Sequence, residues 1–376
     1  MNSLTFTPDS RSLLSGGDDG TLRVWEVEHG EPLRVMEGYA AALYDVAWSP
    51  GGTRLASAGS DSTVIVWEVG REEVRPPKVL RGHRWIVYGV EWRPDGSLLA
   101  SSGWDNAIRL WDTATGNCLQ ILEDPDNPDT LFWGLAWSPD GCMLASGTYH
   151  QGVLVWDVKA HSLRWADRAH STWIRRIAWH PEGTRLVGGD EDGHVYVWDA
   201  ADGTLLQRLP GHHGAVMSVA FSPDASRLAT SSGLGDSGEL VVWDALRGAR
   251  VRDFGGHRGV VTAVTWGRSG EVVVSGGSDG IVRWWKVESE KCVRVQQAHQ
   301  GTVQALKRSP DGSMLASCGE DGAIRLWDLE SGEPLQTLRR DRPYERLNLT
   351  DIRGLTEAQQ ASLRALGAFE ETRDGR

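Results

Sequence analysis

The sequence has little of what disulfide-bonded and membrane proteins need. Its 376 residues include only four cysteines, and these show neither CxxC pairing nor the spacing of a disulfide framework. Such sparse usage suits a reducing cytoplasm. The N-terminus lacks a charged stretch followed by an apolar one, and no apolar run approaches the length of a membrane span. We therefore expect a cytoplasmic protein without a membrane partner.

Positive charge is also scarce. Lysine and arginine number 39 against 51 acidic residues, a net charge of −12, so the basic footprint of nucleic-acid binding is missing. No GxxxxGK[ST] loop is present, which removes nucleotide hydrolysis from this chain. The adjacent His212 and His213 are the only pair with ligand spacing, and they are weak evidence for a metal. We predict no nucleic-acid partner, no cofactor and no metal.

Tryptophan, in contrast, is abundant and regularly spaced. Eight of the 19 tryptophans close a short hydrophobic run and precede a charged residue, at successive intervals of 42, 44, 45, 42, 45, 42 and 42 residues. A period in this range with WD-like dipeptides is typical of four-stranded propeller blades. These eight tryptophans are Trp25, Trp67, Trp111, Trp156, Trp198, Trp243, Trp285 and Trp327.

Each repeat contains signals for four short strands. An inner strand usually carries an aromatic residue 19 positions before the repeat tryptophan, and a Pro-containing turn such as SPDG at 138 follows it. A small-residue strand (LLASSG at 98), an alternating strand (AIRLWD at 107) and a fourth run (NCLQIL at 117) complete the unit. Their length and period-2 alternation favour strands over helices.

These repeats resemble the WD-repeat β-propeller family, over about residues 1 to 339. In that family a buried His, Ser or Thr, Asp and Trp tie each blade together. A hydrogen-bonded set that recurs in most blades is structural rather than catalytic, because it satisfies buried polar groups in each unit. The resemblance implies three complete tetrads: His83, Ser101, Asp105 and Trp111; His257, Ser275, Asp279 and Trp285; and His299, Ser317, Asp321 and Trp327.

We therefore predict an all-β, eight-bladed WD-repeat propeller over residues 1–339 and a C-terminal tail over 340–376 with one short helix. The seam should lie between the first and last blades and be the weakest joint, since Arg308 replaces the inner-strand aromatic of the last blade. Thr356 and Gln359 form a capping-box pattern that begins the predicted helix.

The tail resembles the segment that closes WD-repeat regions in bacterial signalling ATPases of the NACHT or NB-ARC type, the STAND class. That resemblance implies a ligand-sensing module, or a stand-alone relative of one, which associates with an ATPase or effector module. The alternative interpretation is that the predicted helix only caps a blade edge.

Tryptophans outside the repeat positions give the functional prediction. In WD-repeat propellers, the positions three and five residues after the tetrad His and the one before the tetrad Asp open onto the top face. Here they carry aromatic residues on one side only, and aromatic side chains dominate binding hot spots. We predict a non-enzymatic protein- or peptide-binding surface on blades 2 to 5, although the rings could instead fill the channel mouth. Its residues are Tyr44, Tyr88, Trp104, Trp133, Tyr149, Trp173, Arg175 and Glu191.

The fourth repeat breaks the pattern. EDPDNPDTLFWGLAW replaces its Gly-His segment, and His150 stands where the tetrad Asp should be. An acidic loop with Asp124, Asp126 and Asp129 near Trp133 favours a basic peptide ligand; ordinary repeat drift is the competing explanation.

Two other classes of function remain open at this point. An enzyme would need a convergent acid, base or metal at the channel, where the sequence offers only tetrad residues. A structural scaffold would use the propeller rim and the C-terminal tail for assembly.

Overall fold

The computed structural model describes the backbone of residues 3–6, 12–16, 21–26 and 32–37, and both backbone and side chains of residues 42–69, 77–150, 152–169, 172–209 and 211–339. The chain divides into two units, one formed by Met1–Ala41 with Arg339–Arg376 and the other by Ala42–Leu338. In the first unit, β1 (Ser3–Phe6), β2 (Ser12–Gly16), β3 (Thr21–Glu26) and β4 (Pro32–Glu37) form one antiparallel sheet in sequence order.

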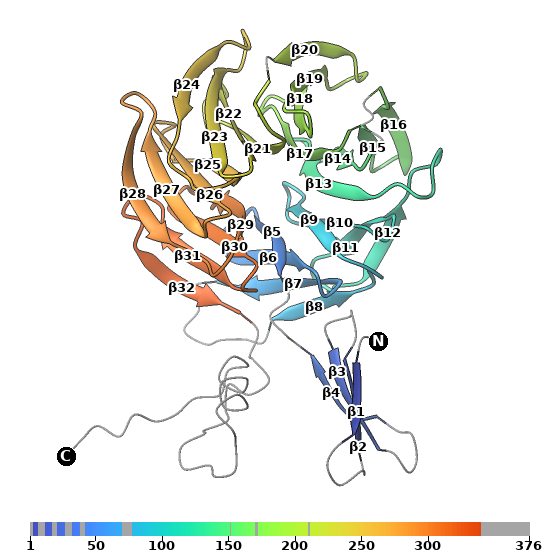
Figure 1. The fold of residues 1–376 in the computed structure, drawn as a ribbon. Coiled ribbons are helices and arrows are strands. Elements are labelled where there is room, and N and C mark those ends of the chain that lie inside the picture. Colours follow the sequence, from blue (N-terminus) through green and yellow to red (C-terminus); the bar gives the residue numbers. More distant parts are fainter. Residues whose placement is uncertain are drawn as a thin grey trace, which may run out of the picture. The chain divides into compact units, whose positions relative to one another are not determined.

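The second unit contains seven four-stranded antiparallel sheets, which we number as blades 2 to 8 after their repeats (Figure 1). Blade 2 is β5 (Leu43–Trp48), β6 (Arg54–Gly59), β7 (Thr63–Glu68) and β8 (Lys78–Arg81); blade 3 is β9 (Val87–Trp92), β10 (Leu98–Gly103), β11 (Ile108–Asp112) and β12 (Cys118–Leu122). Blade 4 is β13 (Phe132–Trp137), β14 (Met143–Thr148), β15 (Val153–Asp157) and β16 (Ser162–Asp167); blade 5 is β17 (Ile174–Trp179), β18 (Arg185–Asp190), β19 (Val195–Asp199) and β20 (Leu205–Leu209). Blade 6 is β21 (Val216–Phe221), β22 (Arg227–Leu234), β23 (Ser237–Asp244) and β24 (Arg250–Phe254); blade 7 is β25 (Val261–Trp266), β26 (Val272–Gly277), β27 (Ile281–Lys286) and β28 (Lys291–Gln297). Blade 8 is β29 (Val303–Arg308), β30 (Met314–Gly319), β31 (Ile324–Asp328) and β32 (Pro334–Leu338).

Close packing between blades explains the small residues of the inner strands. A Cβ placed on Gly89 in β9 would lie 2.7 Å from the carbonyl oxygen of Trp133 in the next blade, so a larger residue there would force the blades apart. The second strand of each blade, such as β10 with its Ala and Ser residues, is buried along almost its whole length. Outer strands, in contrast, expose much of their side-chain surface, because no further strand covers them.

The ring closes with seven blades, so the prediction of eight is wrong. Each inner strand packs beside the next, and β29 of blade 8 packs beside β5 of blade 2. Trp48 Nε1 donates to the carbonyl of Lys307 at 3.1 Å, as Trp92 Nε1 donates to the carbonyl of Ala47 at 3.2 Å. Leu43 and Trp48 also share a core with Cys318. The first repeat forms its own sheet in the other unit, so the predicted 1–339 propeller shortens to residues 42–338.

The seam predicted between the first and last repeats is therefore absent from the ring. A regular period indicates that each repeat forms one blade. It does not indicate how many blades close a ring, because that number depends on how the blades pack against one another. Arg308 still contacts the neighbouring blade 7, because its Nη1 lies 3.5 Å from the carbonyl oxygen of Gly267. The weakness expected of this joint stays a prediction.

The predicted helical tail is not supported either. The residues that the structure describes contain no helix, and hence none that could cross a membrane. Thr356, Gln359 and the rest of residues 340–376 lie outside the described residues.

Candidate ligand-binding surface

A β-bulge at the start of the inner strands directs one side chain per blade out of the usual alternation. In β5, for example, Leu43 and Asp45 pair with consecutive residues of β6, which leaves Tyr44 as the extra residue. A bulge of this kind re-aims a side chain away from the sheet face. Because the inner strands run in the same direction around the ring, these residues gather at one end of its axis. We call them the mouth residues: Tyr44, Tyr88, Trp133, Arg175, Met217, Thr262 and Gln304.

Tyr88 is the centre of a continuous set of ring contacts. Its ring centroid lies 4.5 Å from that of Tyr44, 4.7 Å from that of Trp104 and 4.4 Å from that of Trp133. Trp104 also meets Trp133 edge-on at 5.4 Å and Trp85 edge-on at 6.1 Å. Edge-to-face and offset pairs at these separations are the favourable arrangements of aromatic rings.

The set continues into blades 4 and 5. Trp133 stacks on Trp173 at 5.6 Å, and Trp173 lies 5.8 Å from Tyr149. The structure thus brings seven of the eight predicted binding residues together and adds Trp85. We call these eight residues the aromatic surface. Glu191 is exposed, and among the described residues no ring contact, hydrogen bond or ion pair joins it to this surface. The members of the surface are Tyr44, Trp85, Tyr88, Trp104, Trp133, Tyr149, Trp173 and Arg175.

Exposure divides the aromatic surface into a base and a rim. Trp133 is only 4% exposed, so the prediction that it presents an open face to a ligand needs correction: it supports the other rings from below. Trp85 is 55% exposed and Tyr149 is 38% exposed. Sequence position could indicate that these residues lie at the mouth, but relative depth depends on how neighbouring rings stack.

Arg175 is the positive charge of this surface. Its guanidinium carbon lies 5.0 Å from the centroid of the Trp133 ring, within cation–π range, and its Nη1 donates to Met217 Sδ at 3.4 Å. Burial and the neighbouring Arg176 lower the pKa of Arg175 to about 10, so the side chain is still charged at neutral pH. No carboxylate in the described part of the chain lies within ion-pair distance of it.

Two ion pairs join non-adjacent blades across the ring, one beside the mouth residues and one nearer the other end of the inner strands, and sequence reasoning missed both. Arg176 in blade 5 pairs with the buried Asp45 of blade 2 at 2.8 Å and donates to the carbonyl of Tyr44 at 3.0 Å. Lys307 of blade 8 pairs with Glu91 of blade 3 at 2.9 Å. Burial raises the pKa of the Glu91 carboxyl, and Lys307 opposes that shift. The available signal was a charged residue at inner-strand positions that hold Ala, Gly, Ser or Thr in the other blades.

The tetrads form hydrogen-bonded clusters within their blades. In blade 3, His83 Nδ1 lies 2.7 Å from Asp105 and its Nε2 lies 2.7 Å from Ser101 Oγ, which also accepts from Trp111 Nε1 at 2.8 Å. Burial lowers the pKa of His83. Arg109 extends the cluster through a 2.7 Å ion pair with Asp105. Blades 7 and 8 repeat this arrangement with His257, Ser275, Asp279 and Trp285 and with His299, Ser317, Asp321 and Trp327.

Blade 4 replaces its missing tetrad with a different ion pair. Asp124 is buried and accepts from Arg168 Nη1 at 2.8 Å and Nη2 at 2.6 Å, and Thr130 Oγ1 donates to it at 2.8 Å. Arg168 also contacts Asp126 at 3.1 Å, whereas Asp129 is exposed. Because Arg168 of the chain itself occupies Asp124, this buried carboxylate is not available to a basic ligand, and only the exposed Asp126 and Asp129 still support that prediction.

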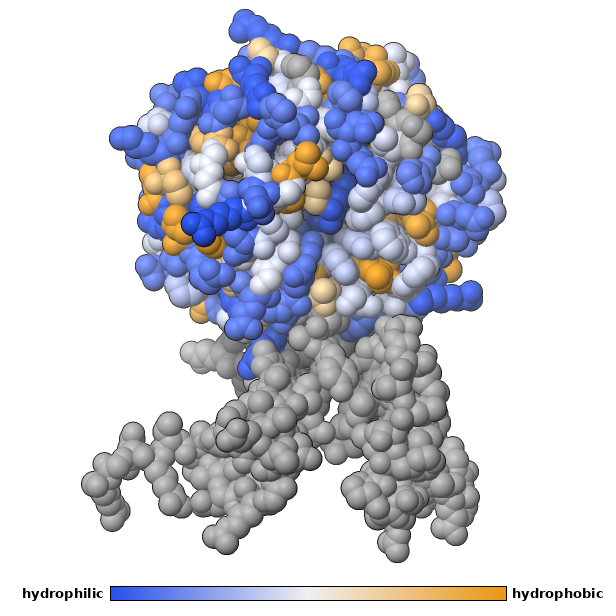
Figure 2. All heavy atoms as spheres, in the orientation of Figure 1, coloured by the Kyte–Doolittle hydropathy of each residue, from blue (hydrophilic) through white to orange (hydrophobic). Residues whose placement is uncertain are grey.

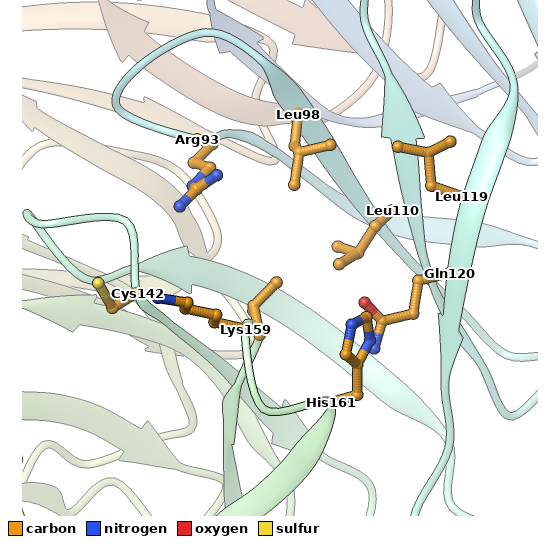
Figure 3. A pocket seen from close by; sticks show the side chains of 9 residues that line it. Arg93, Leu98, Leu110, Leu119, Gln120, Cys142, Lys159 and His161 are labelled. Atoms are coloured by element: carbon orange, nitrogen blue, oxygen red, sulfur yellow. The ribbon is translucent and has the colours of Figure 1, made fainter.

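A groove between blades 3 and 4 lies at the opposite end of these blades, near the turns that follow their inner strands (Figure 3). Leu98, Leu110 and Leu119 form one wall, and Lys159 and His161 lie across from them, around a cavity of about 420 Å³. On the face drawn in Figure 2, hydrophobic residues form small separate patches among hydrophilic ones. The described residues contain no cluster of three or more His, Cys, Asp or Glu side chains that could hold a metal.

Comparison with known families agrees with the repeat structure. The model for the WD domain, G-beta repeat, matches residues 1–26, 30–68, 74–112, 116–157, 162–199, 203–244, 248–286 and 290–328. No curated protein matches the chain. The prediction of a WD-repeat propeller is confirmed, and propellers of this kind are generally non-catalytic modules for protein interaction. The chain therefore belongs to the WD40 family, with eight repeats of which seven form the ring.

Proposed function

We propose that the aromatic surface of blades 2 to 5 binds a protein or peptide, and that the chain has no enzymatic activity. The observation that carries this proposal is the division of the surface into a buried base and an exposed rim. Trp133 holds the rings in place, while Trp85 and Tyr149 offer open faces. Large, rigid rings bind partners with little loss of side-chain entropy, which is why Trp and Tyr are frequent binding anchors.

The other mouth residues support binding over simple filling of the ring. If aromatic rings only filled the mouth, similar residues would be expected around the whole circle. Instead blades 7 and 8 carry Thr262 and Gln304. The Thr262 side chain is buried, and its hydroxyl donates to the carbonyl of Gly276 at 3.1 Å, so its hydrogen bond is made within the propeller. The binding residues are thus concentrated on one side.

The wider role follows from the resemblance of the tail to bacterial STAND-class proteins. We propose a cytoplasmic sensor module, or a stand-alone relative of one, that works with an ATPase or effector module. The sparse cysteines and the lack of a phosphate-binding loop in this chain support that proposal. The ligand would engage the aromatic surface, and the output would come from the associated module.

A selection from a random peptide library displayed on phage tests the binding proposal. The protein and a Trp85→Ala, Tyr149→Ala double variant are compared, with Leu119→Ala as the control because Leu119 is 61% exposed on the outer strand β12. We expect selected peptides to lose at least about tenfold in affinity for the double variant and to bind the control as they bind the unchanged protein. Loss of peptide affinity with Leu119→Ala alone would favour the scaffold alternative, in which the outer edge of the propeller makes the contacts.

A further inference from the structure

We infer that Arg175 is the anion-recognising residue of the aromatic surface, and that the partner presents a single carboxylate next to an apolar side chain. This inference rests on the proposed function and gives it a chemical class of ligand: a peptide segment with Asp, Glu or a free C-terminus beside an aliphatic or aromatic residue.

The first argument is that Arg175 lacks the partner that comparable arginines of this chain have. Arg176 pairs with Asp45, Arg168 with Asp124, and Arg109 with Asp105. Arg175 instead has Met217 Sδ as its polar partner among the described residues. A thioether is a weak acceptor, and a guanidinium offers five N–H donors in a planar fork. Most of its hydrogen-bonding capacity is therefore unused.

The second argument concerns how Arg175 is held. The ring of Trp133 supports the guanidinium at 5.0 Å, and Met217 contacts it from the blade on the other side. Such a fixed fork loses little freedom when it accepts a planar carboxylate in a bidentate arrangement. The adjacent Arg176 cannot take this role, because Asp45 already neutralises it.

The third argument is the balance of donors and acceptors around Arg175. The indole Nε1 atoms of Trp104 and Trp133 are buried and have no hydrogen-bond partner in the structure. The surface thus contains a surplus of donors and no carboxylate of its own. Because buried donors without acceptors are costly, a ligand that brings an acceptor to this region would be favoured over one that brings another donor.

The charge on Arg175 also distinguishes between a cationic group, a phosphate and a carboxylate on the ligand. A Lys or Arg ligand would be repelled by Arg175. A phosphate monoester carries about −1.5 to −2 charges at pH 7 and is usually bound by several arginines. The surface offers one unpaired guanidinium, and the whole chain has a net charge of −12. One carboxylate matches one guanidinium, while the flanking apolar side chain would lie on the exposed rings of Trp85 and Tyr149.

The experiment uses the peptides selected from the random phage library, synthesised with their acidic residue kept, changed to the amide (Asp→Asn or Glu→Gln) or replaced by phosphoserine. Each is titrated by calorimetry against the full chain and against Arg175→Met, which keeps the length and apolar character of the side chain; Arg175→Lys tests whether charge alone suffices. Peptides are made with free and amidated C-termini to separate the two sources of a carboxylate.

We expect acidic residues to be enriched, and the amide change to weaken binding to the unchanged protein about 10- to 100-fold. Arg175→Met should bind the acidic and amide peptides equally, and Arg175→Lys should recover only part of the difference. Thermal unfolding should show Arg175→Met to be at least as stable as the parent chain, because it removes a cation without a carboxylate partner.

Four results would overturn the inference. Selected peptides that lack acidic residues, or an amide effect of the same size in Arg175→Met, would do so while the proposed function stands. Tighter binding of the phosphoserine peptide would replace the carboxylate by a phosphate. If no selected peptide depends on Trp85 and Tyr149, the proposed function fails together with the inference.

Discussion

The ion pair between Arg176 and Asp45 gives the sharpest test of how the ring is held together. Asp45 is 1% exposed, and its Oδ2 accepts from Arg176 at 2.8 Å and from the backbone N–H of Val90 at 3.2 Å. Arg176 also donates to the carbonyl of Tyr44 at 3.0 Å. The pair connects blades 2 and 5, which are not neighbours in the ring. The substitution Arg176→Met removes the cation and keeps the apolar stem.

The expected loss is large because the carboxylate stays behind. Asp45 Oδ1 already lacks a partner, so without Arg176 the buried charge would keep only the N–H of Val90. Removing one partner of a buried pair typically costs about 3 to 5 kcal/mol. Adding Asp45→Asn removes the stranded charge and preserves an acceptor for Val90. We expect the double variant to regain about 2 kcal/mol over Arg176→Met.

Equilibrium unfolding in urea at pH 7, with midpoint and slope both fitted, measures these differences. Arg247→Met is the matched control, because its pair with Asp244 is 3.8 Å long and its side chain is 82% exposed; its midpoint should not move. A loss under about 1 kcal/mol for Arg176→Met, or no recovery in the double variant, would refute the view that this pair is a buried charge held by its partner.

Three further predictions concern stability. Trp111→Ala should cost about 3 to 5 kcal/mol on denaturant titration, because Trp111 is 1% exposed and bonds Ser101, whereas the half-buried Trp104→Ala should cost clearly less; equal losses would contradict the division into core and surface rings. Burial lowers the pKa of His83 and of His257 below 6.5, so the unfolded chain binds more protons than the folded chain just below that pH. The melting temperature should therefore fall as the pH drops below 6.5, and these two histidines should not change it above that pH. Residues 42–338 expressed alone should unfold cooperatively with the midpoint of the ring in the full chain, whereas an eight-bladed ring would lose that behaviour when its first blade is removed.

Much of the architecture follows from sequence alone because it is local and repeated. The tryptophan period, the Pro-containing turns and the strand alternation identify each blade without reference to the others. The tetrad of His83, Ser101, Asp105 and Trp111 lies within one repeat plus the segment before it, so a fixed spacing was enough to predict which side chains meet. The one-sided set of aromatic residues was visible for the same reason, as a departure from a regular pattern.

Other features depend on residues far apart in the chain. The period is the same for seven blades or eight, and packing decided the number when Trp48 met the carbonyl of Lys307, 259 positions away. Asp124 looked like a binding residue until the fold brought Arg168 to it. Trp133 and Arg175 occupy equivalent bulge positions, yet one became the buried base of the surface and the other its unpaired charge. Sequence determines which side chains each blade presents, but the depth and partners of those side chains come from how the blades pack, because burial and ion pairing are properties of neighbours that no single repeat contains.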